Sequence, residues 1–197
     1  MRSREALGQI EGWAADRDLD FRHDPASGFG AAFSRGGEYR YLLWRLPNPR
    51  AKLFGMGMLN PSKADDHADD ATIVRCRRIA AQAGSDNLLV WNLFAYRATL
   101  PAHLKLAAHP AGPDNDAAIS LALGLCRRTV IAWGNNGSHR GRAGEVLARC
   151  AAFDRPLWVL GLTAQGQPRH PLYLAAKVRP HRWRPPRLPS PAAECHC

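Results

Sequence analysis

Three polar side chains stand where apolar runs of the sequence end, and their chemistry suits a ligand. Asn60 is followed by Pro61 and Ser62 in a rigid turn, so its amide can orient a water molecule or a ligand. Asn92 offers one acceptor and two donors, which match the edge of a planar base. His170 can donate a hydrogen bond to charge that develops on a leaving group. A simple Asx turn at Asn60 and a structural histidine are the competing interpretations.

Aromatic and basic side chains follow Asn92 in the sequence. Phe94 and Tyr96 can supply a stacking surface for a base, and Arg97 can hold a phosphate. The alternative places Phe94 and its apolar neighbours in the core. The sequence leaves both interpretations open.

An acidic segment over residues 65–70 surrounds His67 directly after the first turn. Carboxylates and imidazole can bind a divalent ion. Alternatively, Asp69 or Asp70 caps the helix that begins near Thr72, and the other carboxylates are solvated. We favour the cap and expect no metal. We also expect no cofactor, because the sequence has no phosphate-binding Gly-rich loop, no dinucleotide fingerprint and no nucleophile elbow.

These residues need a framework, and the spacing of apolar residues predicts alternating strands and helices. We predict strands over 38–46, 53–59, 87–93, 129–134 and 156–162, and helices over 3–16, 70–81, 114–127 and 139–152. Residues 22–37 are rich in Gly, Ser and Asp and are predicted to be loop. The alternation implies a three-layer α/β/α fold with a mainly parallel central sheet, in which ligands bind at the carboxyl ends of the strands.

Helix signals refine these boundaries. Ser3 and Asp114 are candidate N-caps, and Gly84 is expected to end the helix over 70–81. On that helix, one face is predicted to hold Ile73, Cys76, Ile79 and Ala80, whereas Arg75 and Arg78 lie off it.

The chain of 197 residues divides into three parts. Residues 1–37 are an N-terminal helix and loop extension, residues 38–183 form the α/β domain, and residues 184–197 are predicted to be a disordered, basic, Pro-rich tail. Within that tail, Cys195-His196-Cys197 is too short and too terminal to close a metal site.

The net charge and the cysteine pattern indicate which partners the protein binds and in which cellular compartment it works. Lys and Arg total 27 against 17 acidic residues, a net charge of +10, which favours a nucleic-acid or nucleotide partner; codon bias with a basic tail is the alternative. The five cysteines have no disulfide-scaffold pattern, so we expect a reducing cytoplasm. No apolar run is long enough to span a membrane, so we expect no membrane partner. The oligomeric state stays open, with a monomer favoured.

Short segments at the predicted strand ends and helix starts, which we call the polar blocks, follow one another in an order that resembles that of two protein families. Leu59-Asn60-Pro61-Ser62, Asp69-Asp70-Ala71-Thr72, Asn92-Leu93-Phe94-Ala95, Trp133-Gly134 and Pro168-Arg169-His170-Pro171-Leu172-Tyr173 resemble an uncharacterised bacterial family, domain of unknown function 1643, over about residues 38–183. More distantly, four of these strand-end blocks resemble the uracil-DNA glycosylase superfamily, which implies a uracil-DNA-glycosylase-like fold.

The distant resemblance implies a role for each block. Asn60 takes the place of the water-positioning residue, Asn92 contacts the base edge, and His170 stabilises negative charge on the base as the glycosidic bond breaks. The other base-binding residues implied are Ser62, Phe94, Trp133 and Gly134. The nucleic-acid contacts implied are Arg97, Arg169, Leu172 and Tyr173, of which Leu172 or Tyr173 would intercalate during base flipping.

Two functions follow as hypotheses. The first is hydrolysis of an N-glycosidic bond in damaged or modified nucleic acid. The second is a nucleobase, nucleotide or nucleic-acid binding module without this chemistry, because the amide of Asn60 cannot act as a carboxylate base and the acidic segment suits phosphate poorly. A basic tail that anchors nucleic acid nonspecifically is a third interpretation.

Overall fold

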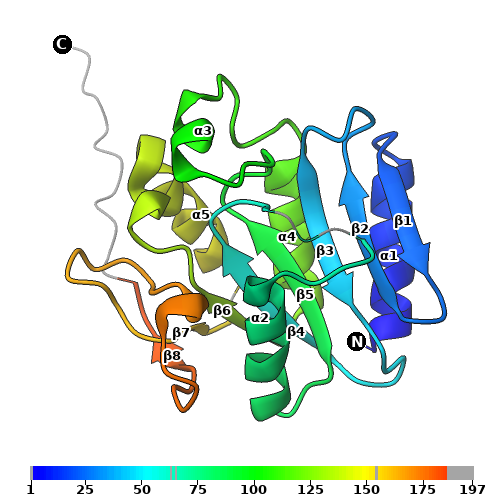
Figure 1. Ribbon diagram of the computed structural model, residues 1–197. Helices are drawn as coiled ribbons and strands as arrows, with labels where there is room; N and C mark the ends of the chain where they lie inside the picture. The colour runs from blue at the N-terminus through cyan, green and yellow to red at the C-terminus, as the bar shows by residue number, and fades with distance from the viewer. Residues whose placement is uncertain (1, 63, 65, 154, 186–197) are drawn as a thin grey trace.

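The central feature of the fold is an eight-stranded mixed sheet (Figure 1). The computed structural model describes residues 2–62, 64, 66–153 and 155–185. The strand order is β1-β2-β3-β5-β4-β6-β7-β8. The strands are β1 (Asp20–Asp24), β2 (Phe29–Phe33), β3 (Arg40–Arg45), β4 (Leu53–Met58), β5 (Asn87–Asn92), β6 (Arg128–Ile131), β7 (Leu157–Val159) and β8 (His181–Trp183).

Strand direction divides the sheet into two regions. The adjacent strands β5, β4, β6 and β7 are parallel, whereas the other four pairings are antiparallel. The parallel strands are joined by helical crossovers, but β1, β2 and β3 follow one another through short turns, which require antiparallel pairing. The prediction of a mainly parallel sheet is therefore wrong for the sheet as a whole, although it describes the strands that carry the polar blocks.

Helices cover both faces of the sheet. The elements are α1 (Ser3–Ala15), α2 (Ala71–Gln82), α3 (Pro101–Leu106), α4 (Asn115–Leu125), α5 (Arg142–Ala151) and the 3-10 segments η1 (Asn135–Gly141) and η2 (Pro171–Tyr173). One hydrophobic cluster joins α1, α4 and α5 to the sheet, and a second joins α2 to the opposite face. Side chains alternate between these clusters, as in β3, where Leu43 belongs to the cluster that contains α2 and Trp44 belongs to the other. None of the described helices is long and apolar enough to cross a membrane.

Helix α2 bears out most of its sequence signals. The Asp70 side chain caps its N-terminus by accepting a hydrogen bond from the Ile73 backbone N–H at 2.9 Å. Gly84 follows the helix with a φ of +80°, the left-handed conformation that ends helices. The predicted apolar face is buried, but Arg75 is buried as well, against expectation. Its guanidinium donates to the Ala175 carbonyl oxygen at 2.8 Å, tying the segment after η2 to the helix.

The N-terminal segment departs from the sequence prediction. Residues 22–37 are not a loop, because β1 and β2 form a hairpin that continues the sheet beyond β3. Ser3 is not the N-cap of α1; Arg2 holds that position, and the Ser3 hydroxyl donates instead to the Asn48 carbonyl oxygen at 2.8 Å. The short helix α3 and the strand β8 were not predicted either. Most of the predicted tail, residues 186–197, lies outside the described residues.

The described cysteines belong to the core. Cys76, Cys126 and Cys150 are buried and free. Burial raises the thiol pKa of Cys126 and of Cys150 to about 12, so both are protonated at neutral pH and unreactive. These three side chains therefore act as small hydrophobic residues of the core. Cys195 and Cys197 lie outside the described residues.

Gly57 allows the close packing of β4 against a tryptophan. Gly57 and Trp91 are partners in the β4–β5 register, and a Cβ atom at position 57 would lie 2.5 Å from the Trp91 ring. Trp91 is fully buried, so an added methyl group has to displace packed neighbours. We expect Gly57→Ala to lower the free energy of unfolding by about 1–3 kcal/mol. Urea denaturation measures this.

A glycine-to-alanine change without a clash is the matched control. Gly8 is exposed in α1, and a Cβ atom there meets nothing within 4 Å. Gly8→Ala should stabilise the protein by roughly 0.5–1 kcal/mol, because alanine favours the helix. Equal stability of Gly57→Ala and the native protein would show that this part of the core tolerates the added methyl group.

Candidate functional site

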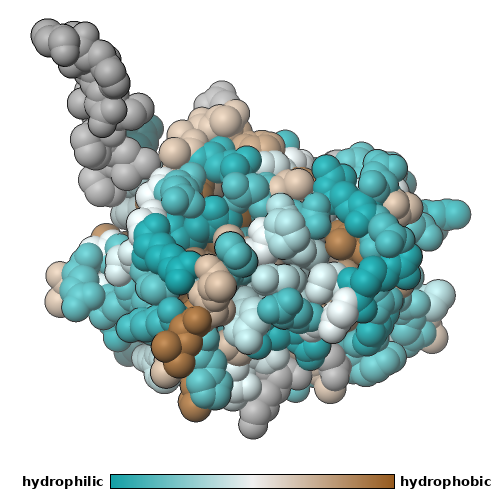
Figure 2. All heavy atoms as spheres, turned by 90° about the horizontal axis from the view of Figure 1, so that it is seen from above, coloured by the Kyte–Doolittle hydropathy of each residue, from teal (hydrophilic) through white to brown (hydrophobic). Residues whose placement is uncertain are grey.

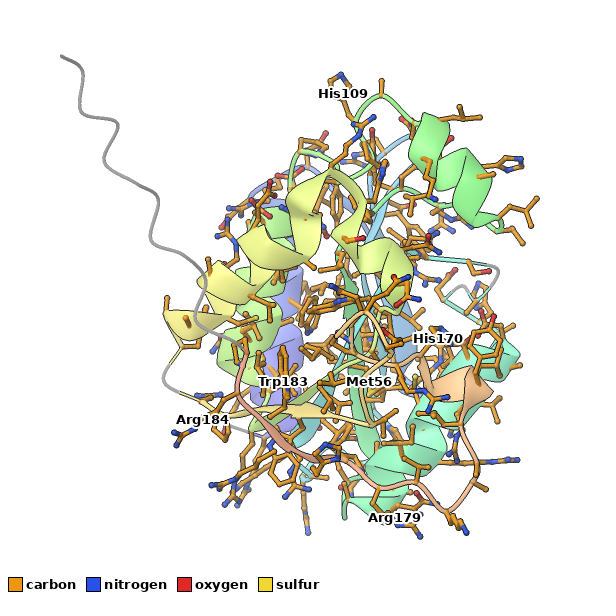
Figure 3. All side chains as sticks on the ribbon, turned by 90° about the vertical axis from the view of Figure 1, so that its left-hand side faces the viewer. Met56, His109, His170, Arg179, Trp183 and Arg184 are labelled. Atoms are coloured by element: carbon orange, nitrogen blue, oxygen red, sulfur yellow. The ribbon has the colours of Figure 1, made fainter. Side chains whose placement is uncertain are left out.

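A pocket of about 570 Å³ lies at the carboxyl ends of β4, β5 and β6, within the size range of small-molecule sites. The view of the molecule from above in Figure 2 is mostly hydrophilic, with a few exposed hydrophobic side chains. His170, labelled in Figure 3, comes from the segment between β7 and η2. The lining includes Asn60 and Ser62 after β4, Asn92 at the end of β5, Trp133 and Gly134 after β6, and Arg169, His170, Leu172 and Tyr173 after β7.

Those nine residues are nine of the eleven that the sequence pointed to, and the other two lie elsewhere. Phe94 is 1% exposed and packs in the core, where its ring centroid lies 5.7 Å from that of His139. The Arg97 guanidinium donates to the Gly37 carbonyl oxygen at 3.0 Å and sits over the Phe33 ring. Phe94 is therefore not available to stack on a ligand in this pocket, against expectation. Arg97 does not line the pocket, and its contact with nucleic acid stays a prediction. Tyr96 is also outside the pocket lining.

The Asn60 amide is oriented by the backbone. Its Nδ2 group donates to the carbonyl oxygens of Pro61, at 2.9 Å, and Ala98, at 2.6 Å. Both partners are acceptors, which fixes which end of the amide is nitrogen. With its two N–H bonds occupied, Asn60 can only accept a hydrogen bond through Oδ1. No described residue donates to that oxygen, so it is available to a water molecule or a ligand.

Asn92 brings an unsatisfied donor to the pocket. Its side chain is 2% exposed, and its Nδ2 group has no hydrogen-bond partner among the described residues. The neighbouring backbone is held by Asn115, whose Nδ2 donates to the carbonyl oxygens of Asn92, at 3.1 Å, and Leu93, at 2.9 Å. A buried N–H group without a partner costs free energy, which a ligand acceptor or a water molecule would recover.

His170 is held as a neutral donor. Its Nδ1 accepts a hydrogen bond from the Leu172 backbone N–H at 3.3 Å, so the ring proton is on Nε2. Burial lowers the pKa of His170, and the nearby Asp70 carboxylate raises it by less. The preceding segment is fixed by backbone bonds from Gly134 N to Pro168 O, at 2.7 Å, and from Arg169 N to Gly161 O, at 2.9 Å. At neutral pH this arrangement offers an uncharged N–H group to the pocket.

This environment predicts how His170 responds to pH. Because its folded-state pKa lies below the ordinary value of 6.5, the unfolded chain takes up a proton first as the pH falls. The contribution of His170 to stability is therefore constant above about pH 6.5 and is lost below it. We expect NMR titration, with the His170→Gln spectrum used for assignment, to give a midpoint below 6.5. A midpoint above that value would mean that a charged imidazole is favoured here.

The acidic segment is built mainly of structural contacts. Asp69 accepts from Arg45 Nε at 2.7 Å and from Arg77 at 2.9 Å, and Asp66 lies 3.0 Å from His67 Nε2. Asp66 and Asp69 are therefore paired and nearly buried, not solvated as predicted. In the part of the chain that the structure describes, no group of three or more His, Cys, Asp or Glu side chains could hold a metal ion. Asp65 lies outside the described residues.

Several residues that line the pocket are not singled out by the sequence. They are Arg40, Asp70, Thr72, Thr99, Asn135, Asn136 and Thr163. Most lie in strand-end segments that the sequence marks for attention, but their types carry no distinct signal. Arg40 begins β3, where no pattern marks it, and its buried guanidinium donates to the Ala64 carbonyl oxygen. The sequence predicts only a helix cap for Asp70, which also lines the pocket.

The rim of the pocket exposes apolar surface. Leu172 is 44% exposed and Tyr173 is 79% exposed, and the Tyr173 ring centroid lies 5.4 Å from that of His170. Inside, the Trp133 indole N–H donates to Gln167 Oε1 at 2.9 Å, which fixes its ring. The pocket thus combines a polar floor with an aromatic and aliphatic edge, an arrangement that suits a planar polar ligand.

Comparison with known proteins identifies the family. The family model described as a protein of unknown function, DUF1643, matches residues 40–172. No curated protein and no solved structure matches the chain, so these comparisons add no support for the glycosylase resemblance. The match covers most of the β-sheet and every strand end that lines the pocket. The chain therefore belongs to the DUF1643 family of proteins of unknown function.

Proposed function

We propose that the pocket binds a nucleobase and that the protein hydrolyses the N-glycosidic bond of a damaged or modified nucleotide in nucleic acid, as uracil-DNA glycosylases do. The observation that carries this proposal is the Asn92 amide. It is 2% exposed, lines the pocket and leaves Nδ2 without a partner among the described residues. A base edge with an acceptor beside a donor satisfies both ends of such an amide.

The neighbouring residues supply the rest of the chemistry. Asn60 Oδ1 accepts a hydrogen bond from a water molecule and so orients it. His170 Nε2–H donates to the base oxygen, where negative charge develops as the bond from sugar to base breaks. A neutral imidazole suits this role because it stabilises the anion while keeping its own proton. The exposed side chains of Leu172 and Tyr173 fill the space that an extruded nucleotide leaves in the stack.

The charge of the protein is consistent with a polyanionic substrate. The net charge is +10, and Arg169 lines the pocket close to His170 in sequence. Phosphate neutralisation by basic side chains provides most of the affinity of proteins for nucleic acid. Binding should therefore weaken as salt is added.

Oligonucleotides that contain uracil, hypoxanthine or other modified bases test the proposal. The native protein is incubated with each, abasic sites are cleaved, and the released base is identified by mass. Strand cleavage only at the modified position is the expected result. If no substrate yields abasic sites under any salt condition, the hydrolytic proposal is rejected.

Asn92→Leu separates function from stability at this site. Leucine has a similar size and removes the buried donor, so we expect the free energy of unfolding to stay the same or rise. Affinity for the base should fall roughly 10- to 100-fold, since one buried hydrogen-bonded pair is lost. Calorimetric titration with the base released by the native enzyme measures the affinity, and urea denaturation measures the stability.

The matched control for Asn92→Leu is Arg97→Ala. Arg97 follows the same strand but lies outside the pocket lining. Base affinity should be unchanged in this variant. Unchanged base affinity in Asn92→Leu would remove Asn92 from base recognition.

A second candidate function is base or nucleotide binding without hydrolysis. The observation that favours it is Asn60, whose amide cannot take a proton from water and whose two N–H bonds are occupied by backbone carbonyl oxygens. Thermal-shift measurements with nucleobases, nucleotides and short DNA distinguish the two functions. Stabilisation by a ligand without any base release favours this candidate, and the absence of stabilisation by every ligand argues against both.

A further inference from the structure

Asp70 presents a carboxylate to the pocket that the proposed function has not yet used. It lines the pocket together with Asn60, Asn92 and His170, and it is only partly buried. As the N-cap of α2, it has extended backbone angles, with φ −86° and ψ 174°. Its Oδ1 accepts from the Ile73 backbone N–H at 2.9 Å. The cap bond therefore holds the carboxylate in one orientation.

The second oxygen of this carboxylate is available. No described residue donates a hydrogen bond to Asp70 Oδ2, and no described cation forms an ion pair with Asp70. By contrast, the adjacent Asp69 is occupied by Arg45 and Arg77. Among the acidic residues of this segment that the structure describes, Asp70 is the one that lines the pocket.

Asp70 also acts on the other polar groups of the pocket. Asp70 and His170 line the same pocket, and the negative charge of Asp70 favours the protonated form of the imidazole. Asn60 Oδ1 can accept a hydrogen bond from water but, as an amide, it cannot remove a proton. A water molecule oriented by Asn60 still needs a base, and Asp70 supplies a carboxylate in the same pocket.

We propose that Asp70 is the general base of the reaction: its carboxylate accepts a proton from the water molecule that Asn60 orients. This rests on the proposed function. The water oxygen forms a bond to the anomeric carbon of the sugar, and the bond from that carbon to the base nitrogen breaks. The electron pair of the broken bond stays on the base, where the His170 N–H stabilises it. The proton of the water moves to Asp70 and then to solvent, and the base takes up a proton from solvent.

Asp70→Asn tests this with little change to the fold. Asparagine caps helices as well as aspartate does, so the bond from Ile73 N and the start of α2 are retained. Single-turnover release of base from the substrate found for the native protein should slow by at least ~100-fold, the range for loss of a general base. Affinity for the free base and the thermal midpoint should remain close to native values.

A second variant restores the chemistry from solution. Asp70→Gly also keeps most of the cap free energy and leaves space where the carboxylate stood. We expect added formate to raise its rate of base release at least tenfold, with no effect on the native protein. A loss of activity that came only from a disturbed helix would not respond to formate.

The control is Asp86→Asn, a change of the same charge at an exposed position outside this pocket, which should leave the rate unchanged. If the native protein releases base and Asp70→Asn releases it at the same rate, the inference is overturned and the proposed function is left intact. Loss of base affinity in Asp70→Asn equal to its loss of rate also overturns it, since Asp70 would then act in binding. If the native protein releases no base from any substrate, the proposed function fails and the inference with it.

Discussion

Asp69→Ala should lower the free energy of unfolding by about 3–5 kcal/mol, the typical cost of removing one partner of a buried ion pair. The partner is Arg45, whose side chain is fully buried and whose Nε donates to Asp69 Oδ1 at 2.7 Å. The Asp69 side chain is itself 11% exposed. Removal of the carboxylate leaves the guanidinium charge inside the protein without this counter-charge.

The surroundings of Arg45 make the pair difficult to replace. Its remaining nitrogens donate to the carbonyl oxygens of Trp44, at 2.9 Å, and Ala68, at 3.0 Å, and its guanidinium lies 4.3 Å from the centroid of the Phe29 ring. These contacts hold the side chain in place, so it cannot turn outward to water when Asp69 is lost. The same contacts connect β2, β3 and the segment before α2.

Arg77→Ala is the control for this prediction. Arg77 shares the same carboxylate, with an Nη1 to Oδ2 distance of 2.9 Å, but its side chain is 41% exposed. Exposed pairs contribute roughly 0.2–1 kcal/mol because water screens them. Urea denaturation should show a large decrease in the free energy of unfolding for Asp69→Ala and a small decrease for Arg77→Ala. Equal losses would mean that burial does not govern the strength of this network.

The strand ends and the α2 cap were predictable from the sequence for a physical reason. Short apolar runs that stop at a polar turn are typical of buried strands, and parallel strands joined by helices place their carboxyl ends on one edge. Asn60, Asn92 and Gly134 therefore came together in one pocket. Asp70 was predictable as a cap because the hydrogen bond that its side chain accepts comes from the nearby Ile73 backbone N–H, in the first turn of the same helix.

The hairpin of β1 and β2 was not predictable because its glycine serves packing. Gly30 belongs to a Gly-rich stretch that predicts a loop. It lies in β2, where a Cβ atom would meet the Arg22 carbonyl oxygen at 2.3 Å and the Trp44 ring at 2.5 Å. Only the tertiary contact reveals why the residue is small. Such a glycine gives the same sequence signal as a turn glycine.

The direction of side chains after the end of a strand could not be predicted from the sequence either. Asn92 ends β5 and lines the pocket, whereas Phe94, two residues later, is buried in the core. Alternation fixes the face of a residue only while the strand continues. After Asn92 the backbone of Leu93 and Phe94 bonds to the carbonyl oxygens of Met58 and Leu59. The path of this loop is therefore set by β4, which a local sequence pattern does not encode.

His170→Ala should reduce the rate of base release by roughly 100- to 1,000-fold, the usual effect of removing one donor to a developing oxyanion. The reduction should appear in kcat with little change in KM, because the negative charge exists only in the transition state. His170→Gln can still donate through its amide, so it should retain part of the lost rate. Single-turnover and steady-state assays on the same oligonucleotide measure both quantities.

The neutral state of His170 makes this prediction specific in its pH dependence. Nδ1 already accepts from the Leu172 backbone, and burial lowers the pKa, so the Nε2–H donor is present without charge at neutral pH. The contribution of His170 should therefore be constant above its lowered pKa and change only in acid. A rate in His170→Ala equal to that of the native protein would assign the histidine to holding η2 in place. His170 Nδ1 accepts from the backbone whether or not Nε2 donates to the base. The rate of His170→Ala therefore distinguishes a catalytic donor from a residue that only holds the backbone.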